Sequence, residues 1–209
     1  MSTSLQRRAY TLFAPWYDLA IESATSQARG MSLGRLKPGS ENDLLLCGAG
    51  SGLDIPHLPA GAAVTALDVT PAMIRRARYR AVRSRRNVFL IIGDATALPF
   101  AAVTFDVVVL HLILAVIPRP DLALAEAVRV LRPGGRLLVF DKFLKPGARA
   151  PLRRLANLVL SPFLTRTDVV FEEVLSAVPG LRVTEDRPAL LGGWFRFITL
   201  EKKTPLERT

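Results

Sequence analysis

Cysteine is nearly absent from this chain of 209 residues, which has one cysteine and two histidines. The single thiol, Cys47, cannot form an internal disulfide, and no cysteine and histidine residues have the spacing of a metal site. The longest apolar run, residues 107–118, falls short of the ~20 residues that a membrane-spanning helix requires. The sequence therefore predicts no disulfide, no zinc site and no membrane span.

The N-terminal residues also do not predict a secretory leader. Residues 1–15 contain Arg7 and Arg8 but neither a continuous apolar stretch nor a small-residue cleavage site. We therefore expect a cytoplasmic location, either free or peripheral at the inner face of the membrane. Half of the residues are hydrophobic and no repeat or biased tract occurs, so we expect residues 1–209 to form one globular domain.

Positive charge is in excess, and the formal net charge is +10. Its densest cluster has Tyr79 as its only aromatic residue and consists of Arg75, Arg76, Arg78, Arg80, Arg83, Arg85 and Arg86. A cluster of this kind attracts nucleic acid or an anionic membrane surface, and a solvated helix face explains it equally well. Because no RNA-binding signature accompanies the cluster, we expect no specific binding of nucleic acid.

Short apolar runs alternate with longer amphipathic segments from residue 42 onward, which is typical of βα units wound into a parallel sheet. Five strands rich in valine, isoleucine and leucine are predicted at residues 44–47, 64–67, 88–92, 105–110 and 136–140. Two more, at residues 181–183 and 194–200, are predicted to be antiparallel neighbours. The expected fold is α/β, with a doubly wound, seven-stranded, mainly parallel sheet.

Helices are predicted between these strands. Thr70 and Pro71 suit the cap and the first residue of one helix, and further helices are expected at residues 53–58, 121–131 and 168–178. Residues 5–37 are predicted to form two helices ahead of the sheet. Aromatic residues around Pro15 fit core packing, a lid or a membrane contact. We expect residues 1–40 to be this lid or contact segment, 41–141 the cofactor-binding core, and 142–209 the acceptor side, with a basic amphipathic stretch at residues 150–164.

A glycine-rich turn, Gly48-Ala-Gly50-Ser-Gly52, follows the first predicted strand. Glycines let a ligand approach the backbone, and a helix start behind them offers N–H groups to a negative charge. Asp68 ends the second strand, where a carboxylate can accept hydrogen bonds from ribose hydroxyls, and Asp94 follows the third, where it can accept from an adenine amine. Each feature alone fits a structural turn, but together at one sheet edge they predict an adenosine-type ligand.

These segments resemble the motif series of class I methyltransferases, which use S-adenosylmethionine. The matching stretches are the glycine turn and residues 66–73, 93–100, 105–109 and 131–135. The resemblance implies a Rossmann-like methyltransferase fold in which Asp68 holds the ribose diol, Met73 packs on adenine, and Asp94 with Ala95 contacts the adenine edge. The cofactor-binding residues that it implies are Gly48, Ala49, Gly50, Gly52, Asp68, Val69, Met73, Asp94, Ala95 and Leu110.

Two departures from known patterns narrow this interpretation. A nicotinamide-binding loop needs its third glycine at position 53, where this chain has Leu53, so a dehydrogenase is a remote alternative. A non-catalytic nucleic-acid-binding protein with this fold is equally remote. The methyltransferase family often has an acidic residue two places before its first glycine, where this chain has Leu46. The resemblance therefore does not imply the usual polar contact near the methionine end of the cofactor, and a few family members lack it as well.

The methyl acceptor is indicated by an N-terminal segment and by the segment after the fourth strand. Residues 10–18 and 111–118 are similar to those of quinone C-methyltransferases and short bacterial phosphatidylethanolamine N-methyltransferases, which implies a lipophilic acceptor at a membrane surface. A soluble small-molecule acceptor is the alternative. Methyl transfer needs a base only where the acceptor starts protonated, and His111, Tyr17 and Asp141 are the candidates. A histidine packed beneath the site is the alternative for His111, and the oligomeric state is left open.

Overall fold

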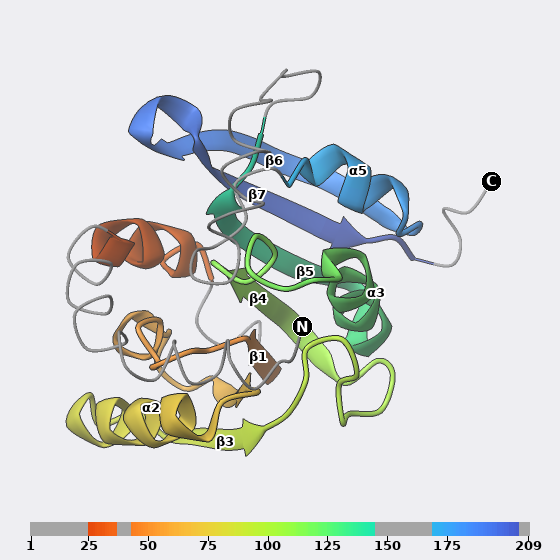
Figure 1. The fold of residues 1–209 in the computed structure, drawn as a ribbon. Helices are drawn as coiled ribbons and strands as arrows, with labels where there is room; N and C mark the ends of the chain where they lie inside the picture. Colours follow the sequence, from red (N-terminus) through yellow and green to blue (C-terminus); the bar gives the residue numbers. More distant parts are fainter. Residues whose placement is uncertain (1–24, 37–42, 145–168, 205–209) are drawn as a thin grey trace.

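A computed structural model describes residues 25–36, 43–144 and 169–204 of the chain. Its seven strands form one sheet in the order β3-β2-β1-β4-β5-β7-β6 (Figure 1). The strands are β1 (Asp43–Cys47), β2 (Ala63–Asp68), β3 (Val88–Ile92), β4 (Phe105–His111), β5 (Leu131–Lys142), β6 (Leu181–Leu190) and β7 (Phe195–Lys202). Neighbours from β3 to β5 pair in parallel, while β7 is antiparallel to both β5 and β6. This arrangement confirms the predicted sheet and its antiparallel final pair.

Helices cover both faces of the sheet, so the fold has three layers (Figure 1). The helix at residues 25–33, the short turn η1 (Ile55–His57) and α2 (Pro71–Arg83) pack on one face, and α3 (Pro120–Val130) with α5 (Phe171–Ser176) on the other. Strand β1 shows why: Leu44 and Leu46 belong to the core on the α2 side, while Leu45 and Cys47 belong to the core on the α3 side. A strand that is buried on both faces requires this continuous apolar sequence.

Four predicted elements differ in extent from those observed. Strand β5, expected at residues 136–140, begins at Leu131 and ends at Lys142. The expected helix at residues 53–58 is only the 3-10 turn η1, and the helix expected at residues 168–178 is the shorter α5. Strand β6 runs on to Leu190 through a polar stretch that contains Pro188. Proline is tolerated there because β6 is an edge strand, with a neighbour on one side only. Of residues 5–37, which were expected to form two helices, 25–33 are helical. Residues 5–24 and the amphipathic stretch at residues 150–164 lie outside the described residues.

The position of α2 is fixed by small residues at its contact with the glycine turn. Pro71 is its first residue, as predicted, but the Thr70 side chain makes no capping hydrogen bond. The helix buries Met73, Ala77 and Ala81 against the sheet side. In the turn, φ of Gly52 is +82°, and a Cβ there would lie 3.0 Å from the Cα of Ala77. Gly52 therefore lets α2 pack directly on the turn.

Among the helices of the described segments, none is long and apolar enough to span a membrane.

Gly52→Ala is expected to destabilise the fold more than Gly61→Ala does. Both glycines have φ above +80°, but a Cβ at Gly61 would have no atom within 4 Å. Both variants should lose about 1–2 kcal/mol from the left-handed backbone, and Gly52→Ala a further 1–3 kcal/mol, roughly, from overpacking against α2. Urea unfolding of the two variants measures the difference. Equal losses would show that the contact with Ala77 carries no strain.

Candidate functional site

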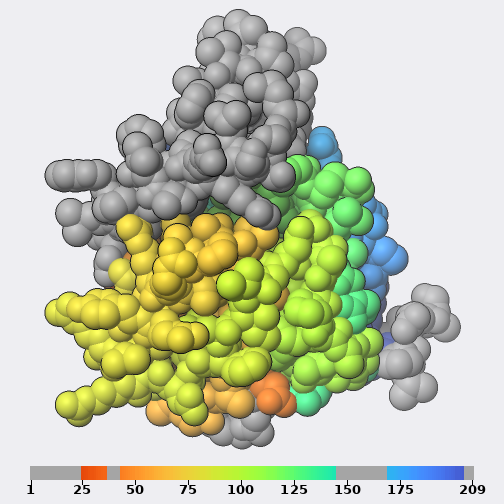
Figure 2. Space-filling model, turned by 60° about the horizontal axis from the view of Figure 1, so that its bottom comes forward, coloured from red at the N-terminus to blue at the C-terminus, as the bar shows by residue number. Residues whose placement is uncertain are grey.

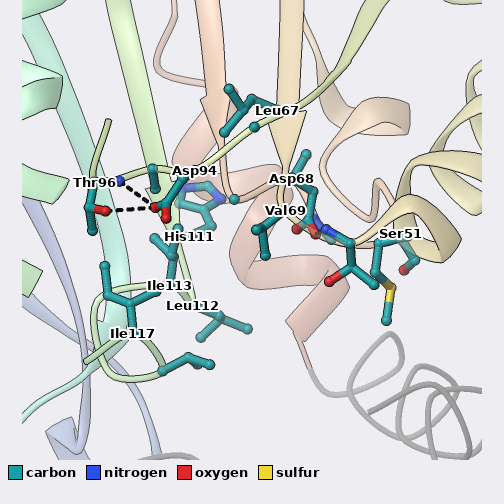
Figure 3. A pocket seen from close by; sticks show the side chains of 18 of the residues that line it. Ser51, Leu67, Asp68, Val69, Asp94, Thr96, His111, Leu112, Ile113 and Ile117 are labelled. Atoms are coloured by element: carbon teal, nitrogen blue, oxygen red, sulfur yellow. Dashed lines mark hydrogen bonds between the residues drawn. The ribbon is translucent and has the colours of Figure 1, made fainter. Parts of the chain in front are cut away.

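A cavity of about 430 Å³ lies at the carboxyl ends of β1, β2, β3 and β4 (Figure 3). Strands β1 and β4 are neighbours at the centre of the sheet, where the order of winding reverses. Ligands of open α/β sheets bind in the crevice at this position. The volume lies in the range of roughly 300–1,000 Å³ that is usual for small-molecule sites. The cavity is therefore the candidate site of this protein.

The glycine turn forms one wall, and backbone hydrogen bonds hold it to the end of β2. The N–H groups of Gly48 and Ala49 both donate to the carbonyl oxygen of Leu67 at 2.9 Å. At Gly48 φ is +73°, and a Cβ would lie 2.1 Å from the Cδ1 atom of Ile113. Only glycine lets the segment after β4 close on this turn. The two segments thus form adjoining walls of the cavity.

Asp68 and Asp94 present carboxylates from the ends of β2 and β3. Asp68 accepts hydrogen bonds from the N–H of Gly50 at 2.9 Å and from the N–H of Thr70 at 2.8 Å, one at each oxygen. Burial raises the pKa of Asp68, and these two N–H groups oppose the shift. Oδ1 of Asp94 accepts from the N–H and the hydroxyl of Thr96, both at 2.8 Å (Figure 3). Both carboxylates are thus oriented before any ligand arrives.

All but two of the expected cofactor-binding residues line this cavity. Gly48, Ala49, Gly50, Asp68, Val69, Met73, Asp94 and Ala95 do so. Gly52 instead packs against α2. Leu110 is fully buried in the core on the α3 side, because alternate residues of β4 face opposite ways and its neighbour His111 faces the cavity. For these two residues the structure indicates a packing role.

The three candidate bases are placed very differently. His111 lines the cavity, whereas Tyr17 lies outside the described residues. Asp141 is 1% exposed and is not among the residues that line the cavity. Its carboxylate accepts hydrogen bonds from the N–H of Ala115 at 3.0 Å and of Lys142 at 2.8 Å. Burial raises the pKa of Asp141 to about 6. Its geometry suits bracing of the segment after β4, which lines the cavity.

Behind the cavity lies a buried polar network that sequence reasoning missed. Arg29 and Ser32 from the helix at residues 25–33 meet Asp54 from the turn after β1 and His111 from the end of β4. Arg29 Nη1 donates to Asp54 Oδ2 at 2.6 Å, and His111 Nδ1 lies 2.7 Å from Asp54 Oδ1. His111 Nε2 lies 3.0 Å from the Ser32 hydroxyl. All four residues are at most 6% exposed.

Asp54 carries a negative charge in this network. Burial alone would raise its pKa, but Arg29 and then His111 outweigh that effect and hold the pKa well below its usual range. An ionised carboxylate only accepts hydrogen bonds, so His111 Nδ1 must carry a proton. In the neutral ring, Nε2 then accepts the proton of the Ser32 hydroxyl. Both ring nitrogens of His111 are therefore engaged.

Serine, histidine and aspartate in this order match the chemistry of a hydrolase relay, but the surroundings do not. Ser32 is 4% exposed and is not among the residues that line the cavity, so a substrate does not reach its hydroxyl. The charge of Asp54 is balanced by Arg29, an arrangement that holds the ring rather than activating a nucleophile. The network thus attaches the N-terminal helix to the strand ends and positions His111 at the cavity wall.

Asp54→Asn is expected to cost about 3–5 kcal/mol of unfolding free energy, because the guanidinium of Arg29 stays buried without its counter-charge. The double variant Arg29→Met/Asp54→Asn should recover part of this loss. Since the folded pKa of Asp54 lies below the unfolded value, its contribution is present above about pH 4 and is lost as the pH falls further. Urea unfolding from pH 7 to pH 3 should therefore show a steeper loss for the wild type than for the double variant. Full stability of Asp54→Asn at pH 7 would contradict this account.

Comparison with known proteins supports the resemblance to methyltransferases that the sequence motifs show. Residues 45–139 match the family described as methyltransferase domain. A phosphatidylethanolamine N-methyltransferase of Cereibacter sphaeroides is 30% identical over 168 residues, which cover 77% of this chain and 80% of that protein. A ubiquinone/menaquinone biosynthesis C-methyltransferase of Roseobacter denitrificans is 47% identical over 79 residues, which cover 37% of this chain and 32% of that protein. The chain thus spans about a third of the length of that quinone enzyme.

Solved structures share the fold. A geranyl diphosphate methyltransferase in complex with S-adenosylmethionine superposes with a TM-score of 0.68 at 17% identity, over 87% of this chain and 85% of that chain. The matched domain contains the strands and loops that form the cavity, and the N-methyltransferase match extends over most of both chains. This chain belongs to the S-adenosylmethionine-dependent methyltransferases.

Proposed function

We propose that this methyltransferase acts on a lipophilic acceptor and that the acceptor is the head-group amine of a phospholipid. The observation that carries the proposal is the group of apolar side chains that line the cavity together with the carboxylates of Asp68 and Asp94. The segment after β4 and the first turn of α3 contribute these side chains. They are Leu112, Ile113, Val116, Ile117 and Leu122, of which Figure 3 labels Leu112, Ile113 and Ile117.

The polar side chains and the glycine turn that line the cavity suit the parts of S-adenosylmethionine in order. Asp94 would accept from the adenine amine, and each oxygen of Asp68 keeps a lone pair for a ribose hydroxyl. The glycine turn and Arg29 would then meet the amino-acid end. Arg29 uses Nε on Thr25 and Nη1 on Asp54, and Nη2 makes no hydrogen bond within the described residues. We therefore assign Nη2 to the cofactor carboxylate, a polar contact that compensates for Leu46 in this chain.

The bound cofactor supplies an electrophilic methyl group on a sulfonium, which an acceptor displaces in line. The protein contributes orientation and exclusion of water. Ile113, closed against Gly48, forms a dry wall between the β4 segment and the glycine turn. Asp141 fixes the same segment through the N–H of Ala115. These contacts position the acceptor side of the cavity relative to the cofactor side.

A neutral amine is required for attack, and neither of the two candidate bases that the structure describes is free to take its proton. His111 holds Asp54 and Ser32 with its two nitrogens, and Asp141 is buried outside the cavity lining. We therefore propose that His111 and Asp141 position the cavity walls. Tyr17 stays a prediction, because it lies outside the described residues. Loss of the proton to water before the amine enters the cavity is consistent with this arrangement.

The mouth of the cavity supports a lipophilic acceptor. Val69, Val116 and Leu122 all line it and yet remain 41%, 37% and 41% exposed. Exposed apolar side chains grouped around a cavity are typical of a site that receives an apolar ligand. The N-methyltransferase relative, which this chain matches over most of its length, carries phosphatidylethanolamine in its name. The apolar mouth fits either lipophilic acceptor, and the similarity to the N-methyltransferase favours a phospholipid amine over a quinone ring.

Asp68→Ala is expected to weaken binding of S-adenosylmethionine by about 2–3 kcal/mol, because two charge-assisted hydrogen bonds to the ribose are lost. Asp68→Asn keeps one acceptor oxygen and should lose less. Asp43→Asn, at the opposite end of β1, is the matched control and should bind normally. Titration calorimetry measures the affinities, and thermal unfolding shows whether loss of the Gly50 and Thr70 contacts has disturbed the turn. Normal affinity of folded Asp68→Ala would refute the ribose assignment.

The acceptor is tested with methyl-labelled cofactor and three acceptors offered separately: phosphatidylethanolamine vesicles, a demethylated quinone in detergent, and a mixture of soluble amines. We expect label in phosphatidylethanolamine, identified by mass spectrometry. Leu122→Glu should reduce this labelling by about tenfold or more, because the free energy of one buried apolar contact is lost. The affinity for the cofactor should not change. Val183→Glu, equally exposed on β6 at 43%, is the control. Label only in the quinone or in a soluble amine would refute the phospholipid assignment and leave the methyltransferase assignment intact.

A further inference from the structure

We infer that the outer face of α2 and the turn that follows it bind an anionic membrane surface. This α2 arginine face consists of Arg75, Arg78, Tyr79, Val82, Arg83 and Arg85, all of them exposed. The inference goes beyond the proposed acceptor, because binding to a membrane requires neither cofactor nor turnover. Figure 2 shows the yellow side chains of α2 at the surface, on the left of the view.

Helical spacing gathers these side chains on one side of α2. Positions 75, 78, 79, 82 and 83 follow the three- and four-residue steps that align along a helix. The opposite side buries Met73, Ile74, Ala77 and Ala81. Tyr79 and Val82 are 68% and 74% exposed, although both are largely apolar. Packing against the sheet explains the apolar residues on the inner side of α2. It does not explain why the outer side combines basic with exposed apolar residues.

No carboxylate of the described residues pairs with the four arginines of this face. No aspartate or glutamate occurs between Asp68 and Asp94. Within the described segments, Arg75, Arg78, Arg83 and Arg85 make no ion pair. Arginines elsewhere in the same segments do pair with carboxylates, as Arg119, Arg129, Arg132, Arg182, Arg187 and Arg196 show. Within the part of the chain that the structure describes, arginines without an ion pair therefore gather on α2 and its following turn, where an anionic partner meets no competing carboxylate of the same segments.

The apolar members of the face distinguish a membrane from a nucleic acid. Arginines alone would suit either polyanion. Val82 lies between Arg78 and Arg83 on the same side of the helix, and a phosphate backbone offers it no partner. At a lipid interface, valine and tyrosine side chains enter the boundary between head groups and acyl chains while the arginines contact lipid phosphates. This combination of side chains favours a membrane.

The face also lies beside the candidate site. The first turn of α2 contributes Met73 to the cavity, and Arg75 follows two residues later. From there the 13 residues of α2 extend about 20 Å. A protein held by this face would therefore rest on the membrane along α2, with one end of the contact at the cavity. Most of residues 1–40 and all of residues 150–164, where membrane contacts were also expected, lie outside the described residues.

The test is sedimentation of the full chain with vesicles of phosphatidylcholine alone or mixed with phosphatidylglycerol. We expect binding to the anionic vesicles only, with release at high salt, because surface charges are screened over a few ångströms there. Arg75→Gln/Arg78→Gln should weaken the binding about tenfold. Arg182→Gln/Lys203→Gln, which removes the same charge near the opposite edge of the sheet, should bind as the wild type does.

Insertion of the apolar residues is tested with Tyr79→Trp, whose added fluorescence should be quenched by brominated lipids in anionic vesicles. Equal losses in the two double variants would reduce the effect to net charge and overturn the proposal. Unchanged binding of Arg75→Gln/Arg78→Gln, or no quenching at position 79, would also overturn it. So would tighter binding of RNA or DNA oligonucleotides through the same arginines. Each variant alters exposed residues only, and circular dichroism confirms that it is folded.

Discussion

The buried charge of Asp54 is the feature on which the geometry of the cavity depends. An ionised carboxylate inside a protein is costly unless its oxygens are fully paired. Here Arg29 takes one oxygen and His111 the other. Because these partners come from an N-terminal helix and from the end of β4, satisfying one charge fixes three separate segments of the chain. The cavity wall is thus specified by electrostatics as much as by apolar packing.

Two buried carboxylates support the site with opposite electrostatic solutions. Asp54 is paired with a guanidinium and has a lowered pKa. Asp141 receives mainly backbone N–H groups, and burial raises its pKa to about 6. Asp54 stays ionised across the physiological pH range, whereas the pKa of Asp141, about 6, lies just below neutral pH. The segment after β4, which Asp141 braces, is therefore the wall whose hydrogen bonding is sensitive to mild acid.

The sequence predicted the parts of this protein that depend on local chemistry. Apolar runs predict the central strands, and Pro71 predicts the start of α2. The site carboxylates were predictable because Asp68 and Asp94 follow strands directly. Arg29, Ser32 and Asp54 were missed, since their bonds join residues 25 to 79 positions apart and no local motif marks such pairs. The length of β6 was missed because antiparallel pairing with β7, not apolar content, holds its polar residues in the sheet.

Strand β3 forms the outer edge of the sheet beside α2, and all five of its residues are apolar. Phe89 and Ile92 are 68% and 56% exposed there. An open edge with this composition is a template on which another chain can add a strand and begin aggregation. Arg85 and Arg86 lie three and two residues before the strand, where gatekeeper residues oppose such pairing by charge repulsion. Part of the arginine cluster would therefore also disfavour self-association at this edge of the sheet.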